Sequence, residues 1–191
     1  MPFILFLGFG TMAERKILAS TVLKTHIKVR LFMHYRIIEP KDDLILADII
    51  RTNLKAHSLD IPGTVYFDDN LNHLSDYYLA SPRRTYFIAL DDADNIIGGI
   101  GLAELDFMDG TAELQKLYLT DAAKGQGLSY KLIELVEKAA VDRGYKQIYL
   151  ETHTNLMTAI HVYEKCGYKL IEKPNEVVHS SMNRFYLKEL T

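Results

Sequence analysis

Residues 114–140 of the chain read LQKLYLTDAAKGQGLSYKLIELVEKAA, and no other stretch says as much about the fold. The first residues alternate, as in a β-strand, and from Leu128 onward apolar residues return at helical spacing. Between these parts lies Lys124-Gly125-Gln126-Gly127, whose two glycines allow backbone amides to approach a ligand closely. Because a helix N-terminus adds free N–H donors and partial positive charge, the pattern predicts a strand, an anion-binding loop and a helix.

The glycine loop by itself is not specific. It is not a P-loop, because no Gly-Lys-Ser/Thr follows, and it lacks the three-glycine spacing of a dinucleotide fingerprint. An ordinary turn with two glycines would read the same way. Its interpretation therefore depends on the rest of the chain.

The chain around this stretch alternates between strands and helices. Three consecutive strands at hairpin spacing predict an antiparallel meander, and Gly98 and Gly99 within one of them indicate a bulge or a close backbone approach. The order predicts a mixed sheet with helices on its faces. Strands are expected at 35–38, 85–90, 96–105, 112–119, 147–150, 168–171 and 184–190, and helices at 42–54, 70–78, 128–139 and 155–166.

Composition excludes several protein classes. The 191 residues are 48% hydrophobic and 25% charged with a net charge of −3, which is typical of a globular protein and not of a disordered one. The single cysteine, Cys166, excludes a disulfide scaffold and a zinc ribbon, and favours a reducing, cytoplasmic location. Residues 33–191 carry 17 basic and 24 acidic side chains, which argues against a nucleic-acid-binding surface.

The first 32 residues form a separate segment of uncertain status. The apolar run from Phe3 to Phe9 is too short to span a bilayer, and no basic residue precedes it as a signal peptide requires. Residues 14–28 have an amphipathic, basic pattern. Three interpretations stay open: an extension upstream of a natural start at Met33, a docked structural segment, or a targeting leader. We expect one domain at 33–191 and no membrane association.

Two runs together resemble the GNAT family of N-acetyltransferases. Residues 114–140 resemble the family's acetyl-CoA-binding motif, whose loop reads Q/R-x-x-G-x-G/A. Residues 159–168, AIHVYEKCGY, resemble its A-x-x-x-Y-x-x-x-G-F/Y segment, in the family's order and separation. The resemblance covers residues 33–190. It implies the acyl-CoA N-acyltransferase fold, an α/β (α+β) fold with a mixed, mostly antiparallel sheet of about seven strands, flanked by helices and splayed between the fourth and fifth strands.

Three positions depart from the family pattern. Lys124 stands where the family usually has Arg or Gln, and it keeps the charge without the planar fork. Ser129 replaces Gly or Ala, and its hydroxyl can donate to phosphate or cap the helix. Asn155 lies one residue before the position of the family's cofactor-contacting Asn, which is Leu156 here, so we expect Asn155 to cap the helix that follows.

The resemblance assigns the binding of acetyl-CoA, as acyl-donor co-substrate, to two segments. Main-chain groups of Leu117, Tyr118 and Leu119 would pair with the pantetheine arm inside the splay. Backbone amides of the loop would hold the pyrophosphate. These loop residues are Lys124, Gly125, Gln126, Gly127, Leu128 and Ser129.

The reaction needs a base, because an ammonium must lose a proton before its nitrogen attacks a thioester, and a buried carboxylate can serve. Some family members carry their base at the position of Glu113, which makes it our candidate. A strand-edge Glu paired with a surface cation remains the alternative, and Glu104 and Glu151 are competitors. Strand alternation would place on one face Glu113, Gln115, Leu117 and Leu119.

The departing thiolate needs an acid. Tyr163 matches the Tyr that family members place near the sulfur, and a phenol of pKa about 10 can donate to a forming thiolate. The alternative is a Tyr packed on the sheet with its hydroxyl on a backbone oxygen. His153 and His161 lack a metal-ligand partner set, so no metal site is expected, although His153 could reach the acceptor end.

These observations predict an enzyme, an N-acetyltransferase that moves an acetyl group from acetyl-CoA to a primary amine by direct attack in a ternary complex. The alternative is a non-catalytic acyl-CoA-binding or interaction module on the same fold. The acceptor is a small-molecule or peptide amine, and residues 59–79, with Asp60, Asp68, Asp69, Asp76, Tyr66 and Phe67, would shape its pocket. A homodimer through the last strands, near Tyr168 and Phe185, is possible.

Overall fold

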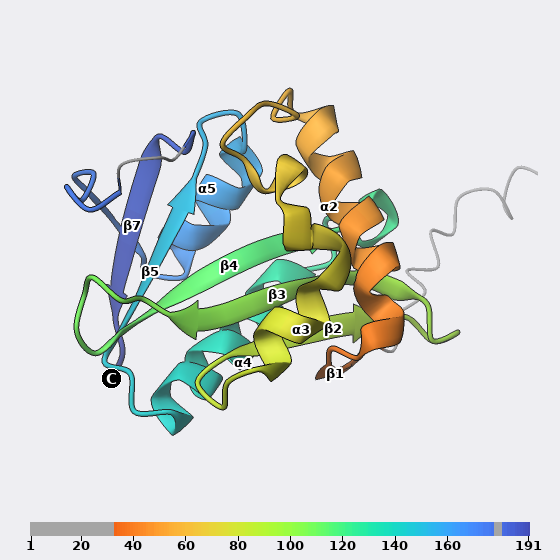
Figure 1. Ribbon diagram of the computed structural model, residues 1–191, viewed down its shortest axis with the longest axis horizontal. Coiled ribbons are helices and arrows are strands. Elements are labelled where there is room, and N and C mark those ends of the chain that lie inside the picture. The colour runs from red at the N-terminus through yellow and green to blue at the C-terminus, as the bar shows by residue number, and fades with distance from the viewer. Residues whose placement is uncertain (1–32, 178–180) are drawn as a thin grey trace, which may run out of the picture. The chain divides into compact units, whose positions relative to one another are not determined.

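The computed structural model describes residues 33–177 and 181–191 (Figure 1). The expected N-terminal extension, residues 1–32, lies outside the described residues. Short turns join the central strands into the predicted meander, and the Asp91 carboxylate closes one turn by accepting the amides of Ala93 and Asn95, each at 2.9 Å. The strands are β1 His34–Ile37, β2 Thr85–Leu90, β3 Ile96–Glu104, β4 Thr111–Leu119, β5 Gln147–Thr152, β6 Lys169–Ile171 and β7 Arg184–Glu189.

The seven strands form one sheet in the order β1-β2-β3-β4-β5-β7-β6. All neighbours are antiparallel except β4 and β5, which are parallel and joined by the crossover helix that such a pair needs. The β4–β5 pairing covers only Thr111–Glu113 and Gln147–Tyr149, and beyond Glu113 the two strands separate in the described part of the chain. The expected mixed sheet with a splay between the fourth and fifth strands is confirmed.

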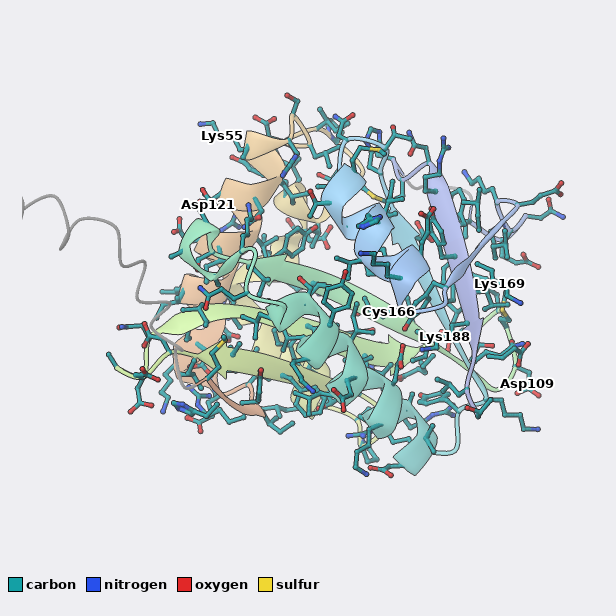
Figure 2. The ribbon with its side chains drawn as sticks, turned by 180° about the vertical axis from the view of Figure 1, so that it is seen from behind. Lys55, Asp109, Asp121, Cys166, Lys169 and Lys188 are labelled. Atoms are coloured by element: carbon teal, nitrogen blue, oxygen red, sulfur yellow. The ribbon has the colours of Figure 1, made fainter. Side chains whose placement is uncertain are left out.

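Helices cover both faces of the sheet. Figure 1 shows α2 and α3 on the near face, and Figure 2, seen from behind, shows α4 and α5 on the other. Among the described residues, no helix combines the length and apolar character needed to cross a bilayer. The helices are α2 Asp43–Ala56, α3 Leu74–Leu79, α4 Leu128–Asp142 and α5 Met157–Lys165, with 3-10 turns η1 Pro40–Asp42, η2 Val65–Phe67, η3 Asp69–His73 and η4 Asp121–Ala123.

Each face of the sheet has its own apolar core, built from the helical stripes that the sequence predicts. On the α2 face, Leu46 and Leu54 pack with Tyr78 and Tyr86. On the α4 face, Leu132 packs with residues of α5, β3 and β5. Since burying such a side chain contributes about 2 kcal/mol, the two cores hold the strands that border the splay in place.

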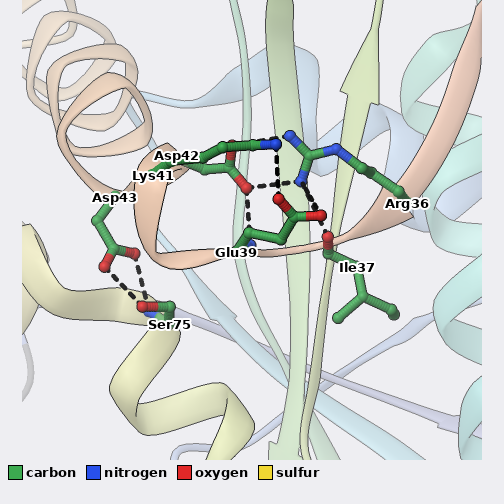
Figure 3. Close-up of polar contacts among 7 residues, drawn as sticks. All are labelled: Arg36, Ile37, Glu39, Lys41, Asp42, Asp43 and Ser75. Carbon is green, nitrogen blue, oxygen red and sulfur yellow. Dashed lines mark hydrogen bonds and ion pairs between the residues drawn. The ribbon is translucent and has the colours of Figure 1, made fainter.

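Polar contacts buried at the start of α2 attach it to β1 and α3 (Figure 3). The Arg36 guanidinium donates two hydrogen bonds to the Asp42 carboxylate, at 2.7 and 2.8 Å. The Glu39 amide donates to the same carboxylate at 2.7 Å. Next to it, the Asp43 carboxylate accepts the amide and the hydroxyl of Ser75, at 2.8 and 2.7 Å. Burial removes water from the two carboxylates, and these charge-assisted hydrogen bonds compensate for that loss. They also orient α2 beside the sheet.

A β-bulge interrupts β4 at Lys116. The β3–β4 register jumps from Gly99↔Tyr118 to Gly101↔Gln115, and Lys116 has a left-handed φ of 49°. The expectation that residues 113, 115, 117 and 119 share a face is therefore wrong, because the extra residue resets the alternation. Glu113 and Gln115 face α3, whereas Leu117 and Leu119 pack in the core on the α4 face.

The glycines of β3 permit this geometry. A Cβ at Gly98 would clash with the Tyr118 carbonyl oxygen, and a Cβ at Gly101 would clash with the Tyr78 hydroxyl. The predicted close backbone approach in this strand is therefore confirmed. It lets the bulged part of β4 lie tightly against β3 and lets Tyr78 reach β4 from α3.

Candidate active site

A cavity of about 550 Å³ lies where β4 and β5 separate. The bulged half of β4 forms one wall, and the start of α4, the start of α5 and the end of β5 form the others. The splay creates this space because, beyond Glu113, the edges of β4 and β5 that face each other are not hydrogen-bonded to one another. The lining residues that matter here are Asn53, His57, Lys116, Leu117, Tyr118, Leu119, Lys124, Gly125, Gly127, Leu128, Ser129, Glu151, His161 and Tyr163.

The glycine loop has the geometry of an anion cradle. Gly125 and Gly127 have φ of 75° and 76°, which turns successive amides toward the start of α4. Gly127 is the N-cap of α4, and no described side chain caps that helix by a hydrogen bond. A Cβ at either glycine would meet no described atom within 4 Å. The loop therefore has open space beside its two glycines and lines the cavity.

Eight of the nine residues expected to bind the cofactor line this cavity. The exception is Gln126, whose side-chain amide donates to the Ala122 carbonyl at 2.8 Å and so turns back onto its own loop. The Lys124 ammonium lies 2.6 Å from the Asp121 carboxylate, and this contact lowers the pKa of Asp121. Part of the positive charge that the loop contributes is therefore already neutralised.

Glu113 occupies the apex of the splay, as the last β4 residue paired with β5. Burial raises the pKa of its carboxyl above the ordinary value, although a hydrogen bond donated by the Gln115 amide at 2.5 Å opposes this, and the charge of Glu151 raises it further. Glu113 is not among the residues that line the cavity, whereas Glu151 is. The Tyr149 hydroxyl donates to the Glu151 carboxylate at 3.0 Å.

The Gln115 side chain is oriented by a second hydrogen bond, from Tyr78. The Tyr78 hydroxyl donates to the Gln115 amide oxygen at 2.8 Å, which leaves the amide nitrogen to face Glu113. Tyr78 is fully buried, and burial raises the pKa of its hydroxyl well above the usual range, so it remains a donor. The carboxylate at the apex is thus held by a chain that begins in α3.

Glu104 does not compete with Glu113 as a base. Its carboxylate lies 2.7 Å from the Arg84 guanidinium, which also stacks on the Tyr77 ring at 4.1 Å. The hydrogen bond from Arg84 lowers the pKa of Glu104, and Glu104 does not line the cavity. Of the two competitors, only Glu151 borders the space where a reaction could occur.

Tyr163 lies on α5 and lines the cavity with 5% of its surface exposed. Burial raises the pKa of its hydroxyl above the ordinary value, and the nearby Tyr118 hydroxyl adds to this effect. Its ring packs edge-on against Tyr168, with centroids 6.0 Å apart. Tyr163 therefore keeps its proton at neutral pH in a fixed position and can act as a donor.

The loop before α5 differs from the prediction. Asn155 does not cap the helix: Leu156 is the N-cap, and the Asn155 side-chain amide instead donates to the His57 carbonyl at 2.9 Å, joining this loop to the end of α2. His153 accepts the Asn155 amide at 3.1 Å and does not line the cavity, unlike His161. Within residues 33–177 and 181–191, no group of three or more His, Cys, Asp or Glu side chains is arranged to hold a metal ion.

Residues 59–79, which were expected to shape the acceptor pocket, act on the cavity through charge and not by lining it. None of their four aspartates or two aromatic residues lines the cavity within the described part of the chain. The charge of Asp68 nevertheless acts on Lys116 and Tyr118. Tyr168 and Phe185, named for a homodimer surface, are buried, so contacts there would have to use their exposed neighbours, such as Leu170.

Lys116 and Asn53 are among the cavity residues that were missed in the sequence. Lys116 was missed because the glycines indicate a bulge or a close approach in β3, whereas the extra residue lies on β4. The Asn53 side-chain amide donates to the carbonyls of Ile49 and Leu119, each at 2.9 Å, and so fixes the end of β4. Its signal was available, because Asn53 is a polar residue beside Leu54 in the apolar stripe of α2.

Comparisons with known proteins agree with this geometry. A model of the Acetyltransferase (GNAT) family matches residues 52–168. The uncharacterized N-acetyltransferase YjgM of Escherichia coli K12 is 32% identical over 134 residues, which cover 69% of this chain and 79% of that protein.

Solved structures share the fold. An acetyltransferase of the GNAT family from Staphylococcus aureus Mu50 superposes with a TM-score of 0.72 at 21% identity, covering 83% of this chain and 99% of that one. Spermidine N-acetyltransferase from Vibrio cholerae, solved in complex with CoA and spermine, gives a TM-score of 0.63 at 20% identity, covering 83% and 95%.

Proposed function

The chain belongs to the GNAT family of acetyltransferases and is an acyltransferase, and we propose that it moves an acetyl group from acetyl-CoA to a primary amine by direct attack in a ternary complex. One observation carries the proposal: a single cavity joins the uncapped glycine loop, the half of β4 that does not pair with β5, and Tyr163. A donor with a diphosphate, an extended amide-containing arm and a thioester matches these three parts in that order.

The donor end fits acetyl-CoA through backbone groups. Amides of the Lys124–Ser129 loop and the positive end of α4 suit a diphosphate. Main-chain groups of Leu117, Tyr118 and Leu119 border the gap left by β5 and can pair with the arm. When bound, acetyl-CoA supplies an acyl group activated as a thioester.

Glu113 serves as the base in this proposal, through a water molecule at the apex of the splay. Its raised pKa makes it a better proton acceptor than an exposed carboxylate, and Gln115 keeps its oxygens in place. Once deprotonated, the amine nitrogen attacks the thioester carbonyl. Glu151 lines the cavity and is the competing base.

Tyr163 donates its proton to the departing sulfur. A hydroxyl of raised pKa is a weak acid, but the thiolate forms beside it against an apolar core, where a charge without a donor is costly. The acceptor is a small-molecule or peptide amine, and we place the reaction in the cytoplasm, which suits a chain with one unpaired cysteine.

Calorimetric titration with acetyl-CoA, followed by thiol release with a panel of amines, tests the proposal. We expect 1:1 binding and turnover, with kcat reduced about 100-fold in Glu113→Gln and acetyl-CoA affinity unchanged, since general bases contribute about that much. Glu151→Gln is the matched comparison, and a larger loss there would move the base to Glu151. Binding without thiol release for any amine would favour the alternative, a non-catalytic acyl-CoA-binding module.

A further inference from the structure

The backbone of Lys116 is unusual for its position. Three described non-glycine residues have a left-handed φ, and two of them, Ser58 and Asp94, lie in turns, whereas Lys116 lies within the central strand β4. This conformation is unfavourable for an L-residue, so it persists only where the surroundings impose it. They do so here through the bulge opposite β3 and through the Tyr86 hydroxyl, which donates to the Lys116 carbonyl at 3.0 Å.

The bulge places Lys116 in the wall of the cavity. Lys116 lines the cavity beside Leu117, the residue expected to contact the pantetheine arm, and the two carboxylates that act on its charge are Glu113 and Asp68. Burial lowers the pKa of the ammonium, while the two carboxylates oppose that change. Lys116 therefore shares three features with the proposed acceptor: a place in the cavity wall, the Glu113 carboxylate acting on its charge and a lowered pKa of its ammonium.

We propose that Lys116 is an internal acyl acceptor, whose Nζ is acetylated from bound acetyl-CoA when no external amine occupies the cavity. The inference rests on the proposed function, because it uses the same donor and the same base. Lys124, the other lysine lining the cavity, does not qualify, because it lies at the glycine loop and its ammonium is paired with Asp121 at 2.6 Å.

The step is an ordinary aminolysis and needs no other reactant. Glu113, directly or through water, takes one proton from the Lys116 ammonium. The nitrogen lone pair then attacks the thioester carbonyl carbon and forms the C–N bond, while the C–S bond breaks and its electron pair leaves on sulfur. The nitrogen gives its second proton to solvent water, which leaves a neutral amide, and Glu113 releases the proton it took to solvent as well. The thiolate takes a proton from the Tyr163 hydroxyl, which recovers one from solvent. The products are acetyl-Lys116 and CoA.

Incubation of the full chain with isotope-labelled acetyl-CoA, without any amine, tests the proposal by peptide mass mapping. We expect one label per chain at Lys116, entering at least about tenfold faster than at Lys124, because the amine is held beside the donor. The rate constant should not depend on protein concentration. Lys116→Arg should lose the label, and the control variant Lys138→Arg, at an exposed lysine of α4 that pairs with Asp142 outside the cavity, should keep it.

Several outcomes would overturn the inference, and they separate it from the proposed function. Equal labelling of Lys116 and surface lysines, or a rate that rises with protein concentration, would mean that Lys116 is not an internal acceptor. Acetyl-CoA binding and amine turnover without label at Lys116 would remove this inference and leave the proposed function intact. No acetyl-CoA binding in parallel calorimetry would remove both. Mapping of the wild-type chain gives an answer even if Lys116→Arg folds poorly.

Discussion

The two ends of the cavity are built in different ways. The proposed donor end consists of consecutive residues, 124–129, which would act through backbone amides and a helix terminus. The proposed acceptor end consists of side chains from different elements: Lys116 from β4, Glu151 from β5 and Tyr163 from α5 line the cavity, and Glu113 of β4 lies beside it at the apex of the splay. Backbone groups tolerate changes of side chain, whereas a cluster of side chains depends on each element that positions it. The two ends should therefore respond differently to mutation.

The largest effect is expected at the acceptor end. Tyr163→Phe removes the proposed acid, so kcat should fall about 100-fold while acetyl-CoA affinity stays the same. Steady-state kinetics with calorimetry of the same preparation measures both. The matched control is Tyr168→Phe, because Tyr168 packs against Tyr163 but does not line the cavity. An unchanged kcat in Tyr163→Phe would mean that solvent protonates the thiolate.

A smaller effect, on binding, is expected at the donor end. Gly127→Ala forces a methyl-bearing residue into φ of 76° in the loop that lines the cavity, so the loop should distort and acetyl-CoA should bind about tenfold more weakly. Gly144→Ala is the control, since Gly144 has φ of 82° and equally open surroundings at the other end of α4. Both variants should lose about 1 kcal/mol of unfolding free energy. Equal acetyl-CoA affinity in the two variants would contradict the cradle.

A third prediction concerns the pH dependence that Gln115 sets. Its hydrogen bond lowers the pKa of Glu113, so Gln115→Met should raise that pKa and move the acidic limb of the kcat/KM profile to higher pH. Tyr78→Phe should move the limb the same way by less, because Gln115 then loses only its anchor. The pH–rate profiles of both variants measure this.

The control for that series is Tyr186→Phe. Tyr186 is an equally buried tyrosine whose hydroxyl donates to Glu164 at 3.0 Å, away from Gln115. Its profile should match that of the wild type. If the limb stays in place in Gln115→Met, the group that titrates is not Glu113.

The smallest effect on activity is expected at Asp42, whose hydrogen bonds hold the start of α2 against β1. Burial opposes ionisation of Asp42, but the hydrogen bonds from Arg36 and Glu39 outweigh it and lower its pKa. Its contribution to stability is therefore present above the unfolded-state pKa of about 4 and is lost as the pH falls through the lower folded-state value. Asp42→Asn should cost about 2 kcal/mol of unfolding free energy at pH 7 with little change in kcat, and the cost should vanish in acid. Denaturant unfolding at several pH values measures this, and a cost that persists in acid would contradict the mechanism.

Much of the fold was predictable because it depends on local patterns. The strands at 85–90, 96–104 and 111–119 and the helix at 128–142 follow alternation, helical stripes and glycines in consecutive residues. The errors lie where a distant group overrides the local pattern. Asparagine often caps helices, but the side-chain amide of Asn155 donates to the carbonyl of His57, which is far away in the chain. Glu113 and Leu117 were assigned to one face, and the bulge separates them.

The glycine loop and the start of α4 could be read directly from the chain, because the ligand-binding groups there belong to the backbone of neighbouring residues. The acceptor end could not. Whether Lys116 enters the cavity depends on the bulge opposite β3, and the bulge depends on glycines about 15 residues earlier whose missing Cβ atoms leave room for β4 and Tyr78. Side-chain direction in a strand reverses with every residue, so one inserted residue changes which groups meet, and only the packed sheet shows where that insertion falls.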